Sequence, residues 1–286
     1  MTALDWRPLA GVDLARLHDA RLQAHYAAQW LARVAFAYIS PKHDDSHTNL
    51  GWEEAFNGFA THKLQGARVG LKLFPLSLAI LEGKDATPAR ILNLEGHKEA
   101  DLRAWFGEEM GSLGLDARSL DIPPPYKIPP HKIATGSPFS VGGIDEVMRE
   151  LAAWFSNADR SIGRLAEAMR LNKFDVSAVR CWPHHFDIAA LITVTAAKDT
   201  IGSERTIGIG LSPGDEHYGE PYFYVTPWPY PEPSKLPPLP EIGRWHTQKF
   251  TAAVLPAHRI LAASGRQTES ERFLGEAVIA ALKTLD

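Results

Sequence analysis

The sequence is poor in cysteine and has no surplus of basic charge. Cys181 is the one cysteine in 286 residues, which excludes an internal disulfide and a cysteine-based zinc site within one chain. Lysine and arginine number 30 against 34 aspartates and glutamates, and neither half of the chain is basic. Phosphate-backbone binding needs such a surplus, so we expect no nucleic-acid partner. Apolar runs stay far below the ~18 residues that span a bilayer, and the first residues do not form a secretory signal, so we expect a cytoplasmic protein with no membrane partner.

The composition that remains is that of a protein with a large hydrophobic core. Apolar residues make up 45% of the chain and charged residues 22%, both close to the average for folded proteins. A length of 286 residues allows one large domain or two small ones. Disorder is therefore excluded as the main state of the chain.

Five stretches repeat apolar residues at the three- and four-residue spacing of helices. The first follows Asp13, whose side chain suits an N-cap, and runs to Ile39, just before Pro41. Gly114 follows the second stretch and suits its C-cap. The other predicted helices cover residues 98–113, 141–171, 250–263 and 269–285.

Stretches rich in branched and aromatic residues predict strands between these helices. They cover residues 52–64, 68–81, 90–94, 176–195, 205–211 and 220–226. The links Gln65-Gly66 and 82–85 are short enough for hairpins, whereas parallel strands need crossovers of about a dozen residues. We therefore expect an α+β fold with mainly antiparallel sheets covered by long helices.

The order of predicted elements occurs twice along the chain. Residues 1–120 and residues 139–286 each contain helix, strands and helix, and the proline-rich stretch 121–138 forms a stiff, extended connector between them. This order predicts a duplicated αβββα unit packed as one compact body. Because identity between the halves is negligible, two unrelated stretches with ordinary alternation stay an alternative.

Two glycine patterns in the second half fail as catalytic motifs. Residues 210–214 (Gly-Leu-Ser-Pro-Gly) match the G-x-S-x-G nucleophile elbow. The elbow uses the N–H of the residue after the serine, and Pro213 has none, so a hairpin turn is the simpler interpretation. Gly208 and Gly210 hint at a phosphate-binding loop, but they lie within a predicted strand that no helix follows, which excludes a dinucleotide fingerprint. Within the strand they leave a trough that aromatic rings or a ligand can fill.

Two further groups of reactive side chains are expected to be structural. Cys181 adjoins a tryptophan in a predicted strand, and no sequence feature marks its surroundings as electropositive, so we expect a buried and inert thiol. Residues 43–47 (His-Asp-Asp-Ser-His) resemble a ligand cluster, but they follow a helix end and contain no apolar residue. A solvated loop is the better interpretation of that cluster.

The first chemically unusual segment is 182–187, which reads Trp-Pro-His-His-Phe-Asp. As a strand it places Trp182 on one face and both His185 and Asp187 on the other, with the latter Cα atoms ~6.6 Å apart. That separation suits an acid and a base on either side of a substrate, or two ligands of one cation. A strand histidine bonded to a backbone carbonyl is the structural alternative.

The second unusual segment is 212–224, a loop that leads into a strand. It places Asp215, His217 and Glu220 close together in sequence and Tyr222 and Tyr224 on one strand face. A solvated acidic hairpin tip is the structural alternative.

Together the two segments predict one candidate site. The candidate catalytic residues are His185, Asp187, Asp215, His217 and Glu220, and the candidate pocket walls are Trp182, Tyr222, Tyr224 and Trp228. We expect no cofactor and no metal; a metal, if one binds, would use His185, Asp187, Asp215 and His217.

The chain resembles a bacterial family of unknown function at these two segments. The matching residues are Trp182-Pro183-x-His185-Phe186-Asp187, Ser212-Pro213-Gly214-Asp215 and Glu220-Pro221-Tyr222-Phe223-Tyr224, with a weaker match at Trp245-His246-Thr247. The resemblance implies a shared architecture over most of the chain and no particular activity.

Two functions stay open on the sequence. The first is a small-ligand-binding protein or an enzyme, hydrolytic in one version, whose pocket lies between the His185/Asp187 strand and the 212–220 loop. The second is a non-catalytic interaction module that docks a partner on its proline-rich surfaces, above all 227–240. The sequence identifies neither the ligand nor the reaction. It also leaves the oligomeric state open, and a homo-oligomer is one of the alternatives. Trp228 and Tyr230 are expected to pack on the domain as a wall of the pocket or as a clamp on the last helices.

Overall fold

The computed structural model describes residues 5–83, 87–195 and 204–285, and the chain forms two compact units. Unit 1 comprises Met1–Gly11, Ala153–Arg180 and Asp187–Asp286, and unit 2 comprises Val12–Ala152 and Cys181–Phe186. These units do not coincide with the predicted halves, because the connector 121–138 lies wholly inside unit 2. The chain instead passes from one unit to the other within a helix, α3 (Asp145–Leu171).

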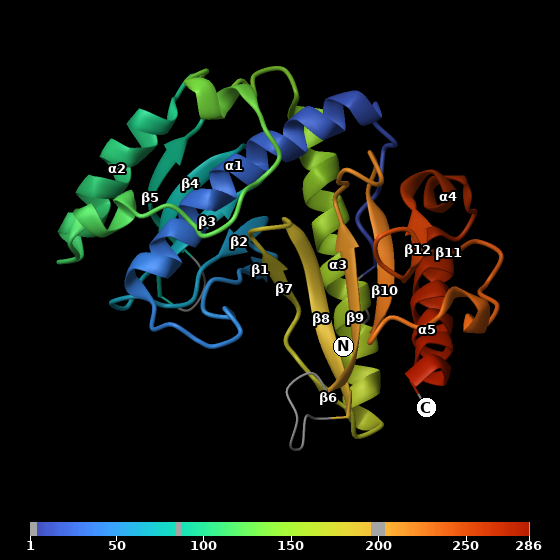
Figure 1. The fold of residues 1–286 in the computed structure, drawn as a ribbon. Coiled ribbons are helices and arrows are strands. Elements are labelled where there is room, and N and C mark those ends of the chain that lie inside the picture. The colour runs from blue at the N-terminus through green and yellow to red at the C-terminus, as the bar shows by residue number, and fades with distance from the viewer. Residues whose placement is uncertain (1–4, 84–86, 196–203, 286) are drawn as a thin grey trace. The chain divides into compact units, whose positions relative to one another are not determined.

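Unit 2 is built on a five-stranded antiparallel sheet in the order β1-β2-β3-β4-β5 (Figure 1). Helix α1 (Leu14–Tyr38) packs against β3, and α2 (Glu99–Ser112) follows the last strand. A short 3-10 turn, η1 (Ala117–Asp121), leads into the proline-rich stretch, and a second, η2 (Lys132–Thr135), interrupts it. The strands are β1 (Gly51–Glu53), β2 (Gly58–Ala60), β3 (Arg68–Lys72), β4 (Ser77–Glu82) and β5 (Thr87–Asn93).

Local signals account for the ends of the helices in unit 2. The Asp13 carboxylate accepts a hydrogen bond of 3.0 Å from the N–H of Arg16, as expected of an N-cap. Gly114 has φ +74°, the left-handed conformation that ends α2. Gln65 and Gly66 also have positive φ, at 45° and 86°, and form the predicted hairpin turn. The second predicted link is described only at Glu82 and Gly83, since Lys84 and Asp85 lie outside the described residues.

Unit 1 is built on a larger antiparallel sheet in the order β11-β12-β10-β9-β8-β6. Together with unit 2, it confirms the expected α+β fold with antiparallel sheets. The remaining elements are β6 (Asp175–Val176), β7 (Arg180–Trp182), β8 (Asp187–Thr195), β9 (Arg205–Ser212), β10 (Tyr222–Trp228), η3 (Pro233–Lys235), β11 (Arg244–His246), β12 (Ala252–Pro256), α4 (Ala257–Ala262) and α5 (Arg266–Leu285).

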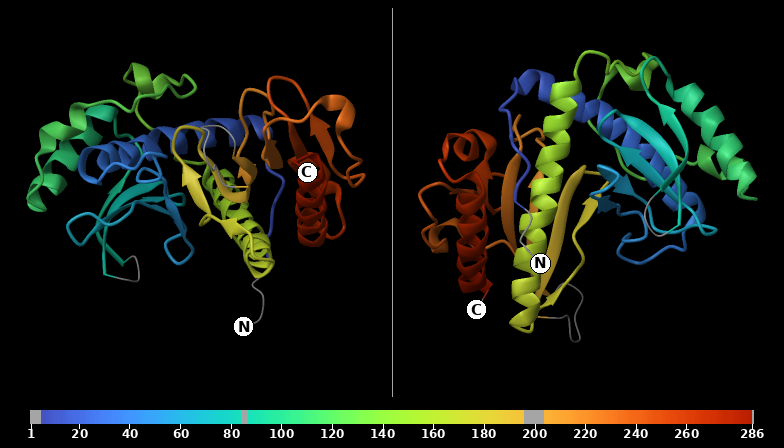
Figure 2. Two further views of the ribbon diagram at one scale, coloured as in Figure 1. Left: turned by 60° about the horizontal axis from the view of Figure 1, so that its bottom comes forward. Right: turned by 180° about the vertical axis from the view of Figure 1, so that it is seen from behind.

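The two faces of the unit 1 sheet differ in chemistry. Helices α3 and α5 cover one face (Figure 2). Phe223 and Val225 of β10 are fully buried on that side. Alternation along the same strand sends Tyr222 and Tyr224 to the opposite face. The apolar core therefore lies on the helix side, and polar aromatic residues gather on the other.

Four predicted elements are wrong in detail. Residues 68–81 form two paired strands, β3 and β4, rather than one. Residues 250–263 form the strand β12 and the short helix α4 rather than one helix, because 253–256 pair with β10. Residues 52–64 form the hairpin β1–β2, with Asn57 at φ +57°. Residues 183–186 form a turn instead of continuing a strand, with Phe186 at φ +58°.

None of the helices among the described residues is both long and apolar enough to cross a membrane. The predicted repeat was a helix, three strands and a helix in each half of the chain. Both halves do have helices before and after a sheet, but neither sheet has three strands. Among the described residues, the sheet of unit 2 has five strands, and the strand order of the unit 1 sheet contains six, from β11 to β6.

Candidate functional site

One row of cross-strand partners defines the face of the unit 1 sheet opposite α3 and α5. Ala189, Gly210, Tyr224, Val254 and Arg244 are successive partners across β8, β9, β10, β12 and β11. Directly opposed residues share a face, so all five side-chain positions point the same way. We call this surface the tyrosine face.

Tyr224 crosses the tyrosine face to reach Asp187. Its hydroxyl donates a hydrogen bond of 2.5 Å to Asp187 Oδ2, and the Asp187 side chain is buried. The ring fills the place where Gly210 has no side chain, because a Cβ there would lie 2.5 Å from Cζ of Tyr224. The trough expected at Gly210 is therefore occupied by an aromatic ring rather than left open.

The 212–220 loop is organised around Asp215. Its Oδ1 accepts the N–H groups of His217 and Tyr218 at 2.7 and 2.9 Å, and its Oδ2 accepts the hydroxyl of Tyr222 at 2.5 Å. Burial, followed by the Asp215 charge, raises the pKa of Tyr222, so that phenol stays protonated and acts as a donor. Asp215 therefore holds the loop in shape, and the loop is packed rather than a solvated tip.

The tyrosines form a continuous aromatic surface. The ring centroids of Tyr222 and Tyr224 lie 6.2 Å apart, and those of Tyr218 and Tyr222 lie 4.7 Å apart. Tyr218 in turn reaches His246 of β11, with 3.0 Å between its hydroxyl and Nδ1. Polar aromatic groups thus extend from Asp187 on β8 to the edge strand β11.

A polar hollow of about 510 Å³ lies at that edge. We call it the β11 hollow. Its lining residues come from the 212–220 loop and from β11 with the residues that follow it; they are Glu216, His217, Tyr218, Arg244, Trp245, His246, Thr247 and Gln248. Of the predicted catalytic residues, His217 lines this hollow.

Hydrogen bonds determine the tautomer of His246. Its Nε2 lies 2.7 Å from the carbonyl oxygen of Gln248, which can only accept, so Nε2 carries the proton. In the neutral ring Nδ1 is then an acceptor and receives the hydroxyl proton of Tyr218. The Phe250 ring stacks on the imidazole at 4.2 Å, so His246 holds Tyr218 in place at the wall of the hollow.

The charged side chains around the β11 hollow differ in whether they have an ion-pair partner. Glu216 lies 3.3 Å from His217 Nε2 and 3.5 Å from Lys249 Nζ. Arg244 has no ion pair or hydrogen bond of its side chain within the described part of the chain; its guanidinium carbon lies 5.6 Å from the Tyr218 ring centroid. An arginine stacked on an aromatic ring keeps its planar N–H groups free for an anionic oxygen.

Two other predicted residues have structural partners. Glu220 accepts the N–H of His258 and contacts its Nδ1, both at 2.7 Å, and so ties the loop to the start of α4. Trp228 is 46% exposed and contacts Tyr230, which is also 46% exposed, at 5.1 Å between ring centroids. About half of each side chain is therefore accessible, so the expected packing of both rings onto the domain is incomplete.

His185 and Trp182 lie in unit 2, in the turn that replaces the predicted strand. The Trp182 carbonyl accepts the N–H groups of His185 and Phe186, at 3.1 and 2.7 Å, which closes the turn. His185 is exposed and its ring lies 4.3 Å from that of His184. The alternation that would put His185 and Asp187 on one strand face does not exist, because the strand β8 begins at Asp187.

Helix α1 holds this turn through the carbonyl of Pro183. His25 Nε2 and Gln29 Nε2 both lie 2.8 Å from that oxygen, and His25 stacks on Phe186 at 5.2 Å. Burial lowers the pKa of His25 to about 4, so the ring is neutral near pH 7 and Nε2 carries its proton. Burial also lowers the pKa of His184 to about 4.

No group of three or more His, Cys, Asp or Glu side chains is placed to hold a metal ion among the residues the structure describes. His185, Asp187, Asp215 and His217 therefore do not form a ligand set there. Cys181 is fully buried, as expected. Of the 43–47 cluster, residues 43–45 are exposed, whereas His47 is buried.

The sequence interpretation missed Tyr218, Arg244 and His246 as site residues. The three meet because β11 pairs with β12 and β12 with β10, a non-local order that the sequence pattern does not reveal. The one available signal was Trp245-His246-Thr247, noted only as part of a resemblance. Comparison with protein-family models, curated proteins and solved structures found no match for this chain.

Proposed function

We propose that unit 1 binds a small molecule with an anionic oxygen group, a carboxylate or a phosphate, in the β11 hollow. Arg244 carries the proposal, because it has no acidic partner among the described residues and its guanidinium lies beside the Tyr218 ring at the wall of the hollow. Such a guanidinium can bind two anionic oxygens at once. His217 and the Thr247 hydroxyl supply further donors.

The proposal keeps the predicted ligand-binding function and relocates its site. Asp215 and Glu220 are engaged in holding the loop and α4, which leaves His217 as the predicted catalytic residue that lines the hollow. In an enzymatic version, His217 is the general acid or base beside a substrate held by Arg244. Tyr222 of the tyrosine face packs on Tyr218 at the wall of the hollow.

Tryptophan fluorescence tests the proposal, since Trp245 lines the hollow. Wild type is titrated with inorganic phosphate, with a dicarboxylate and with an uncharged polyol. Arg244→Gln should weaken anion binding at least about tenfold, the loss of one charge-assisted contact. Arg272→Gln is the matched control, because Arg272 is exposed on α5 and paired with Glu269, and it should leave binding unchanged. Equal binding by both variants, or no anion binding by wild type at millimolar concentration, contradicts the proposal.

The second candidate is an interaction module, favoured by one observation. Trp228 and Tyr230 form an exposed aromatic pair within the proline-rich stretch. Exposed large aromatic residues are typical of contact surfaces between proteins. A Trp228→Ser/Tyr230→Ser double variant should abolish concentration-dependent self-association in sedimentation and keep anion binding. If wild type sediments as a monomer at every concentration, this candidate has no support as a self-association surface.

A further inference from the structure

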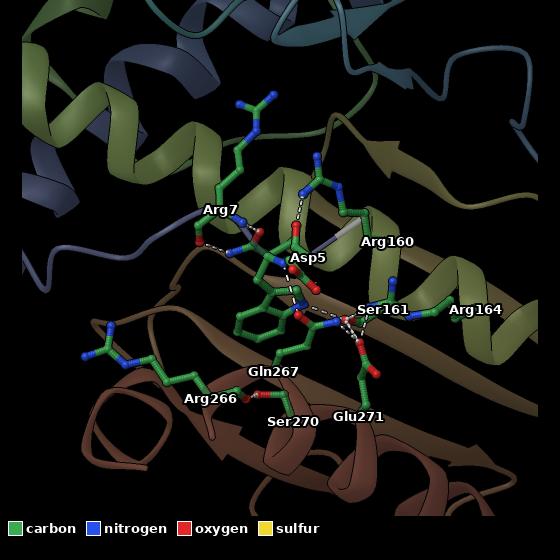
Figure 3. Close-up of polar contacts among 11 residues, drawn as sticks. Asp5, Arg7, Arg160, Ser161, Arg164, Arg266, Gln267, Ser270 and Glu271 are labelled. Atoms are coloured by element: carbon green, nitrogen blue, oxygen red, sulfur yellow. Dashed lines mark hydrogen bonds and ion pairs between the residues drawn. The ribbon is translucent and has the colours of Figure 1, made fainter. Parts of the chain in front are cut away.

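Two clusters of polar side chains in unit 1 differ in whether they are open to a ligand. Between α3 and α5, Trp6 donates to Ser161 at 2.8 Å, Ser161 donates to Glu271 at 3.0 Å, and Glu271 pairs with Arg164 (Figure 3). The chain's own groups therefore occupy that cluster. The β11 hollow instead has a volume of about 510 Å³, and its Arg244 side chain has no ion-pair or hydrogen-bond partner in the described part of the chain.

Strand β11 lies at one end of the unit 1 sheet. Residues 244–246 pair with residues 252–254 of β12, and no strand in the described part of the chain pairs with the other side of β11. The described loops add no backbone–backbone hydrogen bond to these three residues. An edge strand of this kind exposes N–H and C=O groups that can pair with an added chain.

The β11 hollow borders this open edge. Its lining includes all three residues of β11 and the two that follow, namely Arg244, Trp245, His246, Thr247 and Gln248. Since successive residues of a strand point to opposite faces, a hollow that touches all three residues of β11 reaches both sides of the strand. It therefore runs along the edge, where an extended chain of three residues, at about 3.3 Å per residue, is as long as β11.

The charged side chains of the hollow suit the carboxyl end of such a chain. Arg244 is the first residue of β11, and a guanidinium can bind both oxygens of a carboxylate. The 212–220 loop forms the opposite wall, where the Glu216 carboxylate can accept N–H groups. A peptide brings N–H donors for Glu216 together with one carboxylate for Arg244, so it matches both charges of the hollow.

We propose that the anionic group bound in the β11 hollow is the C-terminal carboxylate of an extended peptide, which adds to the open edge of β11. This inference rests on the proposed function of Arg244 and names the class of its ligand. With the carboxylate at Arg244 and the preceding residues beside Trp245 and His246, the peptide runs antiparallel to β11, as neighbouring strands of the sheet do. Backbone pairing then provides affinity that does not depend on the side chains of the peptide.

N-acetylated trialanine tests the inference on the full chain, with tryptophan fluorescence as the readout. The free acid should bind at least about tenfold more tightly than acetate, because it adds backbone hydrogen bonds to the carboxylate contact. The same peptide with a C-terminal amide lacks the charge for Arg244 and should bind at least about tenfold more weakly than the free acid. Arg244→Gln should remove this difference between acid and amide, and the control Arg272→Gln should keep it.

Backbone pairing is tested by methylating the amide nitrogens of the free-acid peptide one at a time. At one position or more, methylation should weaken binding at least about fivefold, because a methylated nitrogen cannot donate to a carbonyl of β11. Equal binding of the free acid and the amide, or of every methylated peptide and its parent, overturns the inference. Phosphate or a dicarboxylate that binds through Arg244, with no gain from the peptide, overturns it and leaves the proposed function standing. If wild type binds neither anion nor peptide, the proposed function is wrong as well.

Discussion

At the scale of single residues, the tyrosine face depends on phenols that donate to carboxylates. Tyr224 donates to the buried Asp187, and Tyr222 donates to Asp215. A buried carboxylate that loses a donor loses part of the compensation for its desolvation. These hydroxyls therefore contribute to stability in addition to the rings that carry them.

Tyr224→Phe isolates one hydroxyl from its ring. The variant should lower the free energy of unfolding by about 1–3 kcal/mol, because Asp187 stays buried with one donor fewer. Urea denaturation followed by circular dichroism measures the difference. Tyr230→Phe, at a half-exposed ring, is the control and should change stability by less than about 0.5 kcal/mol. Equal stability of wild type and Tyr224→Phe would show that the hydrogen bond contributes nothing.

At the scale of elements, the glycines of β9 make room for side chains of β10 on the tyrosine face. The ring of Tyr224 lies where a side chain of Gly210 would be, and a Cβ at Gly208 would lie 2.9 Å from Thr226 Cγ2. Because neither glycine has a side chain, the side chains of Thr226 and Tyr224 from β10 can lie across β9 at these two positions. The turn after β9 and the strand β10 then follow directly, which is why the G-x-S-x-G match has no catalytic meaning.

Gly210→Ala should destabilise the protein by about 1–3 kcal/mol, because the new methyl group displaces the Tyr224 ring from Asp187. Gly163→Ala is the matched comparison. Gly163 lies inside α3 with open space around it, so the same change should stabilise by up to ~1 kcal/mol. Thermal denaturation of both variants measures the contrast. A stabilising effect at Gly210 would contradict the packing described for the tyrosine face.

The sequence predicted those elements whose signals are local. Asp13 and Gly114 mark helix ends through their own conformations, and the helices that they bound were placed within a few residues. Residues 250–263 were predicted as one helix, yet the pairing of 253–256 with β10 makes that part a strand. The stretch predicted as a single strand contains a hairpin turn that ends at Asn57, whose φ of +57° is the left-handed conformation that asparagine tolerates in turns.

The candidate site was predicted in part for the same reason. Asp187, Tyr222 and Tyr224 share a face because strand alternation is local, although the pairing that joins them is not. His185 was misplaced because Pro183 and its neighbours form a turn. Arg244 and His246 come beside the 212–220 loop only through the order of β11, β12 and β10, which no spacing in the sequence encodes.

At the scale of the whole molecule, each unit is assembled from separate parts of the chain. Unit 2 is completed by Cys181–Phe186, which the neutral His25 and Gln29 hold through the Pro183 carbonyl. His25 has a folded-state pKa of about 4, below its ordinary value of 6.5. Between pH 4 and pH 6.5 the unfolded chain therefore binds more protons than the folded chain. The contribution of neutral His25 to the free energy of unfolding is present above pH 6.5 and is lost as the pH falls toward 4.

Between pH 7.5 and pH 5, the titration of His25 should lower the free energy of unfolding by about 2 kcal/mol. The reason is that His25 becomes protonated in the unfolded chain over this range, whereas the buried ring of the folded chain stays neutral. Denaturant unfolding at the two pH values measures the loss. His25→Gln retains an amide donor for the Pro183 carbonyl and cannot titrate, so its pH dependence should be smaller by that amount. His43→Gln, at an exposed histidine, is the control and should show the pH dependence of wild type. Identical pH dependence in all three chains would contradict the role of His25.

A crystal structure of the protein with the anion that binds best tests the central claim most directly. We predict an anion in the β11 hollow, with one or two of its oxygens about 3 Å from the guanidinium nitrogens of Arg244 and with His217 as a further contact. Density for the anion away from Arg244, or an empty hollow at a concentration that saturates binding in solution, would contradict the account.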